Sequence, residues 1–536
     1  MRPFVKTRSV WRSKWMLILI VLAAVVVRLI GIGQPFIDLW SWRQSDVAAI
    51  ARNFLETGFH FSYPQIDWAG TAPGFVGTEF PILPFVAALC YKVTGVQEWV
   101  GRIQGVILFA AALPFFFLLV RRIFGEVVGI WATFFYAFAP LSVVASRAFM
   151  PDIPSLSLAL VGTYFFVVWL EEKDRRALIV SALLFSLSFL IKMPTAVIGL
   201  PLFYLAITAW RDGRRFHSQG GALSKPPFGN GKSEDGGLES AAPWGDTLKR
   251  LFTSLQLWLF ALIALVPSAL WYWHAHGIAK THYPYHFFGG GGFQIMNAGW
   301  YWKIADLTVR SSLTPMLSVL AIVGAFVTPR GKYTRIFHWW LAAMIAFIFF
   351  VGWGNRHQWY QLPLVPIAAV FAGCACQWVA SRFQSRRALL AVASVLLAAF
   401  FVFSSHQSAL PLIRPTAAGL RNLGLELREA TTPTALIVAA DEGDPTVFYY
   451  AHRKGWHFPE EGVYHGNPLD SAQLIANLEK LRDRGATHLV FYEGTSWWLK
   501  EYREFAERLA SSATLVEETP EFTIFRLQPP SPPTPP

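Results

Sequence analysis

The segment GQPFIDLWSWRQSDVAAIARNFLETGFHFSYPQIDWAGTAPGFVGTEFPILP, residues 33–84, is polar, aromatic and acidic, and it lies between two apolar blocks. The chain as a whole is hydrophobic. Of its 536 residues, 54% are hydrophobic and only 15% are charged, whereas soluble proteins carry about 25% charged residues. This composition predicts a polytopic membrane protein in which residues 33–84 form a loop outside the bilayer.

The formal net charge of +12 does not indicate a nucleic-acid partner. The basic residues form short clusters beside apolar segments instead of a periodic polar face, so membrane topology explains them better. The three cysteines, Cys90, Cys374 and Cys376, lie in apolar sequence. We interpret them as core residues and not as a disulfide, zinc or redox motif.

The first loop contains the pattern of an amphipathic helix that follows Asp46 and ends at Gly58. Its apolar stripe consists of Val47, Ile50, Ala51, Phe54 and Leu55. We expect this helix to lie along the membrane surface. The prolines of TEFPILP stop a helix from running through Glu79, whose carboxylate then stands at the lip of the next apolar segment. Asp38, Asp46 and Glu79 are therefore predicted to lie near one membrane interface.

Eleven stretches approach the length of about 20 apolar residues that a spanning helix needs. They lie near residues 15–33, 101–120, 127–146, 153–170, 177–191, 194–210, 251–273, 311–328, 336–353, 359–380 and 387–404. Residues 82–96 are apolar but short, and we interpret them as a juxtamembrane or re-entrant helix. With the amino terminus inside, the clustered cations fall on the cytoplasmic side, as the positive-inside rule requires. An odd number of spans places the carboxyl end outside.

The predicted organisation is a mainly α membrane domain over residues 1–404, with residues 211–250 as a flexible cytoplasmic linker. Residues 415–527 combine the strand patterns TALIVAA, THLVFYE and EFTIFRL with the helix patterns DSAQLIANLEKLRDRGA and WLKEYREFAERLASS, which predicts a small extracytoplasmic α/β domain. Residues 528–536 form a disordered proline-rich tail. Residues 274–310, rich in histidine, aromatic residues and glycine, are predicted to form an outer loop that acts as a lid.

The pair DLWSWRQSDVAAIARNF and TEFPILPFVAAL resembles the first external loop of GT-C membrane glycosyltransferases, most nearly family 39. That family includes the protein O-mannosyltransferases and the lipid A aminoarabinose transferases. The resemblance implies a GT-C fold and an inverting transfer of a sugar, a hexosyl or pentosyl group, from an undecaprenyl or dolichyl phosphate carrier. It implies an acceptor that is a glycolipid, polysaccharide or protein at the outer face of the cytoplasmic membrane.

The resemblance further implies that Asp38, in the pattern D-x-W-x-x-R, is the base that removes the acceptor's proton. Asp46 is either a second catalytic acid or the N-cap of the surface helix. Asp152 in MPDIP resembles a second acidic position of the superfamily. The alternative is that Asp152 caps its helix or pairs with Arg147.

Glu79 matches the acid that ends this loop in the aminoarabinose transferases, where it is associated with a metal and the carrier phosphate. It is thus a candidate catalytic residue and the candidate ligand of a divalent cation. No other cofactor is expected. Phe80 stands where those relatives have lysine, and Glu79 could instead pair with Arg43 or Arg52.

Six residues are candidates for substrate binding. Lys192, a lone cation between two predicted spans, could hold the carrier phosphate as a point charge, and Arg43 and Arg52 could add charge. The element GNRHQWYQLPLVP supplies the others. The six are Arg43, Arg52, Lys192, Arg356, His357 and Tyr360. Each of these residues also has a structural interpretation, such as snorkelling of the lysine to the interface.

Two hypotheses from other classes stand beside the enzyme. A transporter or flippase for a lipid-linked sugar would also need intramembrane charges, but it predicts matching broken helices in two internal repeats, and no such repeat occurs in the sequence. A non-catalytic envelope assembly protein would use the C-terminal domain to bind a partner, and its membrane acids would be dispensable.

Overall fold

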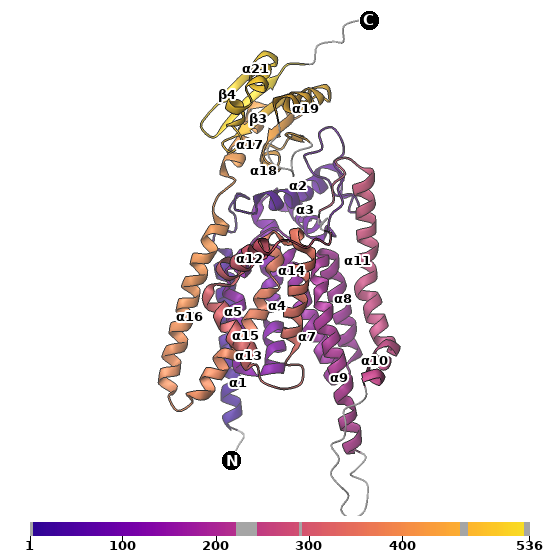
Figure 1. Cartoon of the computed structure of the whole chain (residues 1–536), viewed down its shortest axis with the longest axis vertical. Helices are drawn as coiled ribbons and strands as arrows, with labels where there is room; N and C mark the ends of the chain where they lie inside the picture. Colours follow the sequence, from indigo (N-terminus) through magenta and orange to yellow (C-terminus); the bar gives the residue numbers. More distant parts are fainter. Residues whose placement is uncertain (1–3, 221–243, 289–291, 461–469, 530–536) are drawn as a thin grey trace, which may run out of the picture.

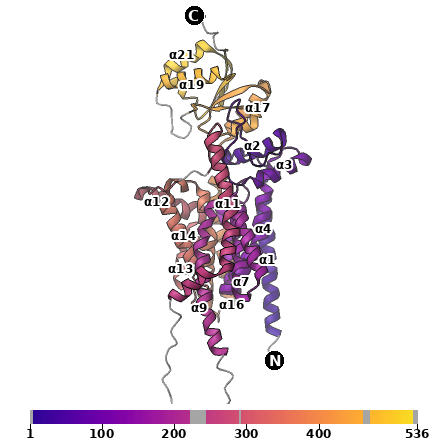
Figure 2. The same cartoon turned by 90° about the vertical axis from the view of Figure 1, so that its right-hand side faces the viewer.

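The computed structural model describes residues 4–220, 244–288, 292–460 and 470–529. A helical bundle carries a small sheet domain at one end, and two short helices of the first loop lie between them (Figures 1 and 2). The central part of the predicted linker, residues 221–243, and residues 530–536 of the predicted tail lie outside the described residues.

The bundle follows the predicted spans closely. Its elements in chain order are α1 (Phe4–Leu29), α4 (Glu98–Phe124), α5 (Glu126–Phe138), α6 (Pro140–Ala145), α7 (Asp152–Glu172), α8 (Arg175–Ile191), η1 (Met193–Ile198), α9 (Gly199–Gly220), α10 (Trp244–Thr253), α11 (Leu255–Thr281), α12 (Ala298–Leu307), η2 (Thr308–Leu313), α13 (Pro315–Val327), α14 (Ile336–Val351), η3 (Gly352–Asn355), η4 (Gln358–Gln361), α15 (Leu364–Arg382), α16 (Arg387–Ala409) and η5 (Leu410–Ile413). Each of the eleven predicted ranges overlaps at least one of these helices.

Length and composition alone qualify fewer helices as crossings. Among the described residues, 7 helices are long and apolar enough to cross a membrane, or up to 8 if the bent pair of Ala298–Leu313 and Pro315–Val327 is one span. The predicted number of eleven also counts α1, α5 and α8, of which α5 has 13 residues and α8 has 17. The chain is a mainly α, multi-pass membrane protein.

Burial separates the middle of the bundle from its edge. The apolar windows of α7 and α15 are 78% and 72% buried, whereas those of α11 and α16 are only 11% buried. A helix that is apolar all round must bury its whole circumference either in protein or in lipid. The helices α7 and α15 therefore form the protein core, and α11 and α16 present most of their surface outward (Figure 1).

The first loop forms α2 (Ser41–Thr57) and α3 (Ile82–Thr94). The prediction that α2 is amphipathic, with a single apolar stripe, is wrong, because every residue from Arg43 to Phe54 is buried. The helix is covered by α3 and by α18 (Thr446–Ala451) of the sheet domain. The helix α3 is the short apolar helix that was expected. Its exposed face includes Val93 and also Cys90, which is thus not a core residue.

The C-terminal domain begins with α17 (Ala418–Ala430) and contains one five-stranded sheet in the order β2-β1-β3-β5-β4. The predicted strands are β1 (Leu436–Ala440), β3 (His488–Tyr492) and β5 (Phe522–Leu527), and the predicted helix α19 spans Ser471–Asp483. The second predicted helix is divided at Tyr502 into α20 (Trp498–Glu501) and α21 (Arg503–Ser512). The sequence did not predict β2 (Lys454–His457) or β4 (Ala513–Glu518). The strands β2, β1 and β3 are parallel, and β5 is antiparallel to both β3 and β4.

The predicted outer loop at residues 274–310 is partly helical. The helix α11 has 27 residues, or about 40 Å at 1.5 Å per residue, so it extends beyond the ~30 Å hydrocarbon core and carries His274 and His276. The helix α12 covers Ala298–Leu307. Residues 289–291, within the run of glycines, lie outside the described residues.

Candidate functional site

Glu79 is the centre of a buried charge cluster at the end of the bundle that faces the sheet domain. Its Oε2 accepts hydrogen bonds from Arg43 Nη2 at 2.6 Å and Thr78 Oγ1 at 2.9 Å, and its Oε1 accepts one from Lys192 Nζ at 3.2 Å. The loop is fixed there because the backbone N–H of Phe80 donates to Leu190 O at the end of α8. Burial alone would raise the pKa of Glu79, but Arg43 and Lys192 outweigh it and hold this pKa at about 2. Glu79 is therefore a permanent carboxylate that organises two cations.

Asp152 completes this cluster from the first turn of α7. Its Oδ1 lies 3.6 Å from Lys192 Nζ, while its buried Oδ2 has no hydrogen-bond partner within the described residues. The N-cap of α7 is Pro151, and no side chain caps the helix. The alternative pairing with Arg147 is also wrong, because Arg147 Nη2 donates to Gly31 O. Asp152 and Glu79 thus share Lys192.

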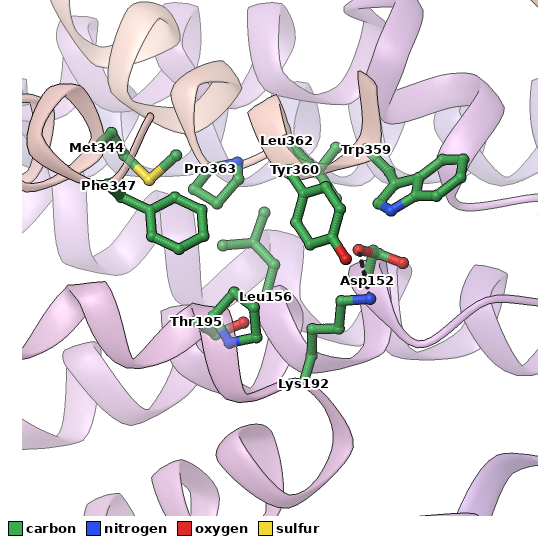
Figure 3. Close-up of a pocket in the computed structure, with 11 residues that line it drawn as sticks. Asp152, Leu156, Lys192, Thr195, Met344, Phe347, Trp359, Tyr360, Leu362 and Pro363 are labelled. Carbon is green, nitrogen blue, oxygen red and sulfur yellow. Dashed lines mark ion pairs between the residues drawn. The ribbon is translucent and has the colours of Figure 1, made fainter. Parts of the chain in front are cut away.

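A small pocket opens beside Lys192 (Figure 3). Figure 3 shows the hydroxyl of Tyr360 turned toward Lys192 and Asp152, and the Lys192 ammonium lies 5.0 Å from the centroid of the Tyr360 ring. The remaining lining is mostly apolar and consists of Leu156, Pro194, Thr195, Met344, Phe347, Trp359, Leu362 and Pro363. Such a lining suits an amphiphile whose anionic head reaches the lysine.

Of the predicted element at residues 354–366, only part reaches this pocket. His357 stacks on Trp359 with ring centroids 4.4 Å apart and also contacts Trp42. Burial, with a smaller contribution from Arg356, lowers the pKa of His357 to about 3. Arg356 is exposed, and its guanidinium lies over the ring of Trp353. Neither Arg356 nor His357 lines the pocket.

Asp46 lies on the same face of α2 as Arg43, one turn further along the helix. The N-cap of α2 is Trp40, so the interpretation of Asp46 as the cap is wrong. Asp46 Oδ1 accepts a hydrogen bond from Trp68 Nε1 at 3.0 Å. Burial raises the pKa of Asp46 to about 7, against the opposing effects of Trp68, Arg43 and His457. A carboxyl group with this pKa can both lose and gain a proton near neutral pH.

Asp38 belongs to a different set of contacts. It accepts hydrogen bonds from the backbone N–H of Trp40 and from Gln44 Nε2, and it lies 3.5 Å from Arg102 Nη2. Arg102, which the sequence did not single out, also donates to the carbonyls of Gln34 and Pro35. The three candidate acids of the first loop, Asp38, Asp46 and Glu79, therefore have separate hydrogen-bond partners.

Arg52 is also remote from the pocket lining. It forms an ion pair with Asp67, and its Nη1 donates to Tyr449 O in the sheet domain. The sequence did not identify Asp67, Trp68 or His457 as relevant, because their partners are distant in the chain and follow no local pattern. Arg52 joins the first loop to the sheet domain and has no contact with the Glu79 cluster.

The residues around Glu79 do not fit a divalent cation. Both of its carboxylate oxygens already accept from cationic side chains. In the part of the chain that the structure describes, no group of three or more histidine, cysteine, aspartate or glutamate side chains could hold a metal ion.

The comparisons with known proteins agree with this architecture. Residues 78–223, which include Glu79, Asp152 and Lys192, match the family model described as dolichyl-phosphate-mannose-protein mannosyltransferase. ArnT from Cupriavidus metallidurans bound to undecaprenyl phosphate is 15% identical, with a TM-score of 0.62 over 95% of this chain and 97% of that chain. AglB from Archaeoglobus fulgidus, an archaeal oligosaccharyltransferase in complex with an inhibitory peptide and a dolichol-phosphate, is 13% identical, with a TM-score of 0.58 over 98% of this chain and 75% of that chain.

Comparison with curated proteins finds no match. The chain therefore has the fold of the GT-C membrane glycosyltransferases, as the first loop predicted, and residues 78–223 match the mannosyltransferase family model.

Proposed function

We propose that the chain transfers a single sugar, a hexosyl or pentosyl group, from a polyprenyl phosphate carrier to a hydroxyl of its acceptor, with inversion at the anomeric carbon. The acceptor is a glycolipid, a polysaccharide or a protein. In this reaction the acceptor oxygen forms a bond to the anomeric carbon and gives its proton to a base. The bond from that carbon to the phosphate oxygen breaks, and the polyprenyl phosphate leaves with the electron pair.

The observation that carries the proposal is the position of Lys192. Its ammonium group stands at the mouth of an apolar pocket and is held by Asp152 and Glu79. A fixed cation at this place can stabilise the charge that develops on a leaving phosphate, because electrostatic stabilisation needs donors that are already oriented. The apolar walls suit the first isoprene units. The solved ArnT with undecaprenyl phosphate and the solved AglB with a dolichol-phosphate support this class of donor.

We propose Asp46 as the base in preference to Asp38. Asp46 adjoins Arg43, which contacts Glu79, so it lies on the side of α2 that faces the charge cluster. Its partner Trp68 is neutral and leaves the carboxylate free to take a proton. Asp38 instead accepts hydrogen bonds from Gln44 and lies 3.5 Å from the cation Arg102, so its oxygens are already engaged away from the Glu79 cluster.

We place the site and the sheet domain at the outer face of the cytoplasmic membrane. In Figure 1, α1 starts at the end of the bundle that is remote from the sheet domain, so the two lie on opposite sides of the membrane. The cations Arg121, Arg122, Arg175 and Arg176 lie at turns on the side of the amino terminus, which supports a cytoplasmic location for that side. The assignment is tested by reporter fusions, and an inactive phosphatase fusion after residue 529 would contradict it.

The activity itself is tested with purified protein, a radiolabelled polyprenyl phosphosugar and candidate acceptors. Lys192→Ala should lower kcat/KM for the donor. The fall should correspond to a loss of roughly 1–3 kcal/mol of transition-state stabilisation, the contribution of a charged hydrogen-bond donor. The matched control is Lys92→Ala, because Lys92 is a cation of α3 that lies over Phe59 and outside the pocket. Equal donor kinetics in Lys192→Ala and wild type would remove Lys192 from the site. Absence of transfer from every donor tried would contradict the proposed function.

A further inference from the structure

The sheet domain presents a buried histidine–aspartate pair to the first loop. Asp441 follows β1 directly and His457 is the last residue of β2, so both stand at the carboxyl edge of neighbouring parallel strands. His457 Nδ1 lies 2.7 and 2.9 Å from the two carboxylate oxygens of Asp441, and the two side chains are 3% and 1% exposed. Because a carboxylate only accepts, Nδ1 carries the proton and the tautomer of His457 is fixed.

This histidine packs directly on the residue that holds Asp46. The rings of His457 and Trp68 lie 5.0 Å apart, and Trp68 Nε1 donates to Asp46 Oδ1. The loop segment around Trp68 is tied to the edge of β2 by two backbone hydrogen bonds, from Gly70 N to Gly455 O and from Gly455 N to Asp67 O. The sheet domain therefore fixes the position of Trp68, and the hydrogen bond from Trp68 orients the carboxyl group of Asp46.

The helix α2 itself is fixed to the same domain. Ser41 Oγ donates to Asp444 Oδ2 at 2.8 Å, and Ser45 Oγ lies 3.1 Å from Thr446 Oγ1. Both serines precede Asp46 on α2, and Ser45 is its immediate neighbour. His457 Nε2 is buried and makes no hydrogen bond within the described residues, which is an unusual cost for a purely structural side chain. Stability alone does not account for the pair.

We propose that His457, held by Asp441, is a positioning residue of the transfer reaction: it fixes Trp68 so that Asp46 is held in the orientation in which it takes the acceptor's proton. The inference rests on the proposed function, with Asp46 as the base. It makes the C-terminal domain part of the active site. It also explains why a buried carboxyl group is kept next to a neutral indole and an imidazole.

The test uses the full-length protein and the variants His457→Gln, Asp441→Asn and Trp68→Phe. Each should lower kcat by about 10- to 100-fold, since small displacements of a catalytic group cost up to about 10² in rate, and each should leave the donor KM within about twofold. The control is His488→Gln, because His488 is a second buried histidine of the same sheet and its Nδ1 lies 2.9 Å from Thr487 Oγ1. It should behave as wild type.

A second readout does not depend on turnover. The infrared carbonyl band of protonated Asp46, identified by its loss in Asp46→Asn, should titrate near pH 7 in the wild type. The groups that face Asp46 are Arg43, Trp68, His457 and Asp444. Loss of the His457 imidazole should move the midpoint to higher pH, and His488→Gln should not change it.

Unchanged kcat and an unchanged midpoint in His457→Gln and Asp441→Asn would overturn the inference. The inference would also be overturned if His457→Gln and His488→Gln lowered kcat equally and neither variant shifted the Asp46 midpoint. That result would show that His457 has only a structural role. If the wild-type protein transfers no sugar but the Asp46 midpoint is still higher in His457→Gln than in wild type, the proposed function is refuted. The positioning of Asp46 by His457 would then still stand.

Discussion

Two carboxyl groups of the first loop, those of Glu79 and Asp46, are buried in opposite environments. At the mouth of the bundle, Glu79 is compensated by Arg43 and Lys192, and its pKa is held at about 2. At the contact with the sheet domain, Asp46 has a neutral indole as its hydrogen-bond partner, and burial raises its pKa to about 7. One loop therefore supplies two different carboxyl groups. Glu79 stays ionised, whereas Asp46 can gain and lose a proton near neutral pH. The first is suited to hold a phosphate-binding lysine, and the second to accept a proton.

The largest effect is expected at Asp46. Asp46→Asn keeps the size and the acceptor oxygen for Trp68 but cannot take a proton, so kcat should fall by about 10²–10⁴-fold with little change in donor KM. Steady-state kinetics with a saturating acceptor measure it. Asp38→Asn is the matched control and should lose less than about 10-fold. If Asp38→Asn loses the activity and Asp46→Asn retains it, the base is Asp38, as the sequence alone suggested.

The second largest effect is expected on the stability of the Glu79→Gln variant. Glu79→Gln leaves Arg43 and Lys192 buried without their shared counter-ion, and it should lower the free energy of unfolding by about 3–5 kcal/mol. Glu171→Gln is the control, since Glu171 pairs with Arg122 at a more exposed position and should cost about 0–1 kcal/mol. Chemical denaturation in detergent micelles measures both.

The pH dependence of the Glu79 effect has a defined sign. The pKa of Glu79 is lowered from 4.5 to about 2 on folding, so its stabilisation is fully present above pH 4.5 and is lost as the pH falls through about 2. The difference between Glu79→Gln and wild type should shrink over this interval. A difference that is constant from pH 7 to pH 3 would show that the ion pairs do not provide the stability.

The smallest effect has the opposite sign. The pKa of Asp46 is raised from 3.8 to about 7 on folding, so its cost to the folded state grows as the pH rises from about 4 and is complete above about 7. Asp46→Asn should therefore stabilise the protein at pH 8 by about 1 kcal/mol or more, and should not change stability below pH 4. The same denaturation experiment decides it, and a destabilised Asp46→Asn protein at pH 8 would refute the proposed environment of Asp46.

Local sequence patterns predicted the helices but not the contacts of the polar residues. The ranges of the apolar stretches, the short helix α3 and the strands β1, β3 and β5 follow from hydrophobic periodicity, which is a property of neighbouring residues. Asp152 was identified as a functional candidate because it resembles an acidic position of the GT-C superfamily, and Lys192 because it is a lone cation between two predicted spans. The structure adds that they pair with each other.

The separation of Asp38 from Asp46 could not be predicted in this way. The two acids are eight residues apart, but their environments depend on Arg102 from α4 and on Trp68 and His457, which the chain brings together only on folding. The burial of α2 has the same origin, since α18 lies about 400 residues further along the chain and covers it. Periodicity along one helix does not reveal which distant segment packs against its polar face.

The central claim is that Asp46 is the group whose ionisation controls transfer. The most direct measurement is the dependence of kcat on pH between 5 and 9 for wild type and His457→Gln, with donor and acceptor saturating. The account predicts that wild-type kcat rises with pH through a midpoint near 7, because Asp46 must be ionised to act as the base, and that the midpoint lies higher in His457→Gln. A wild-type kcat that is constant over this range, or a midpoint near 7 that persists in the residual activity of Asp46→Asn, would contradict it.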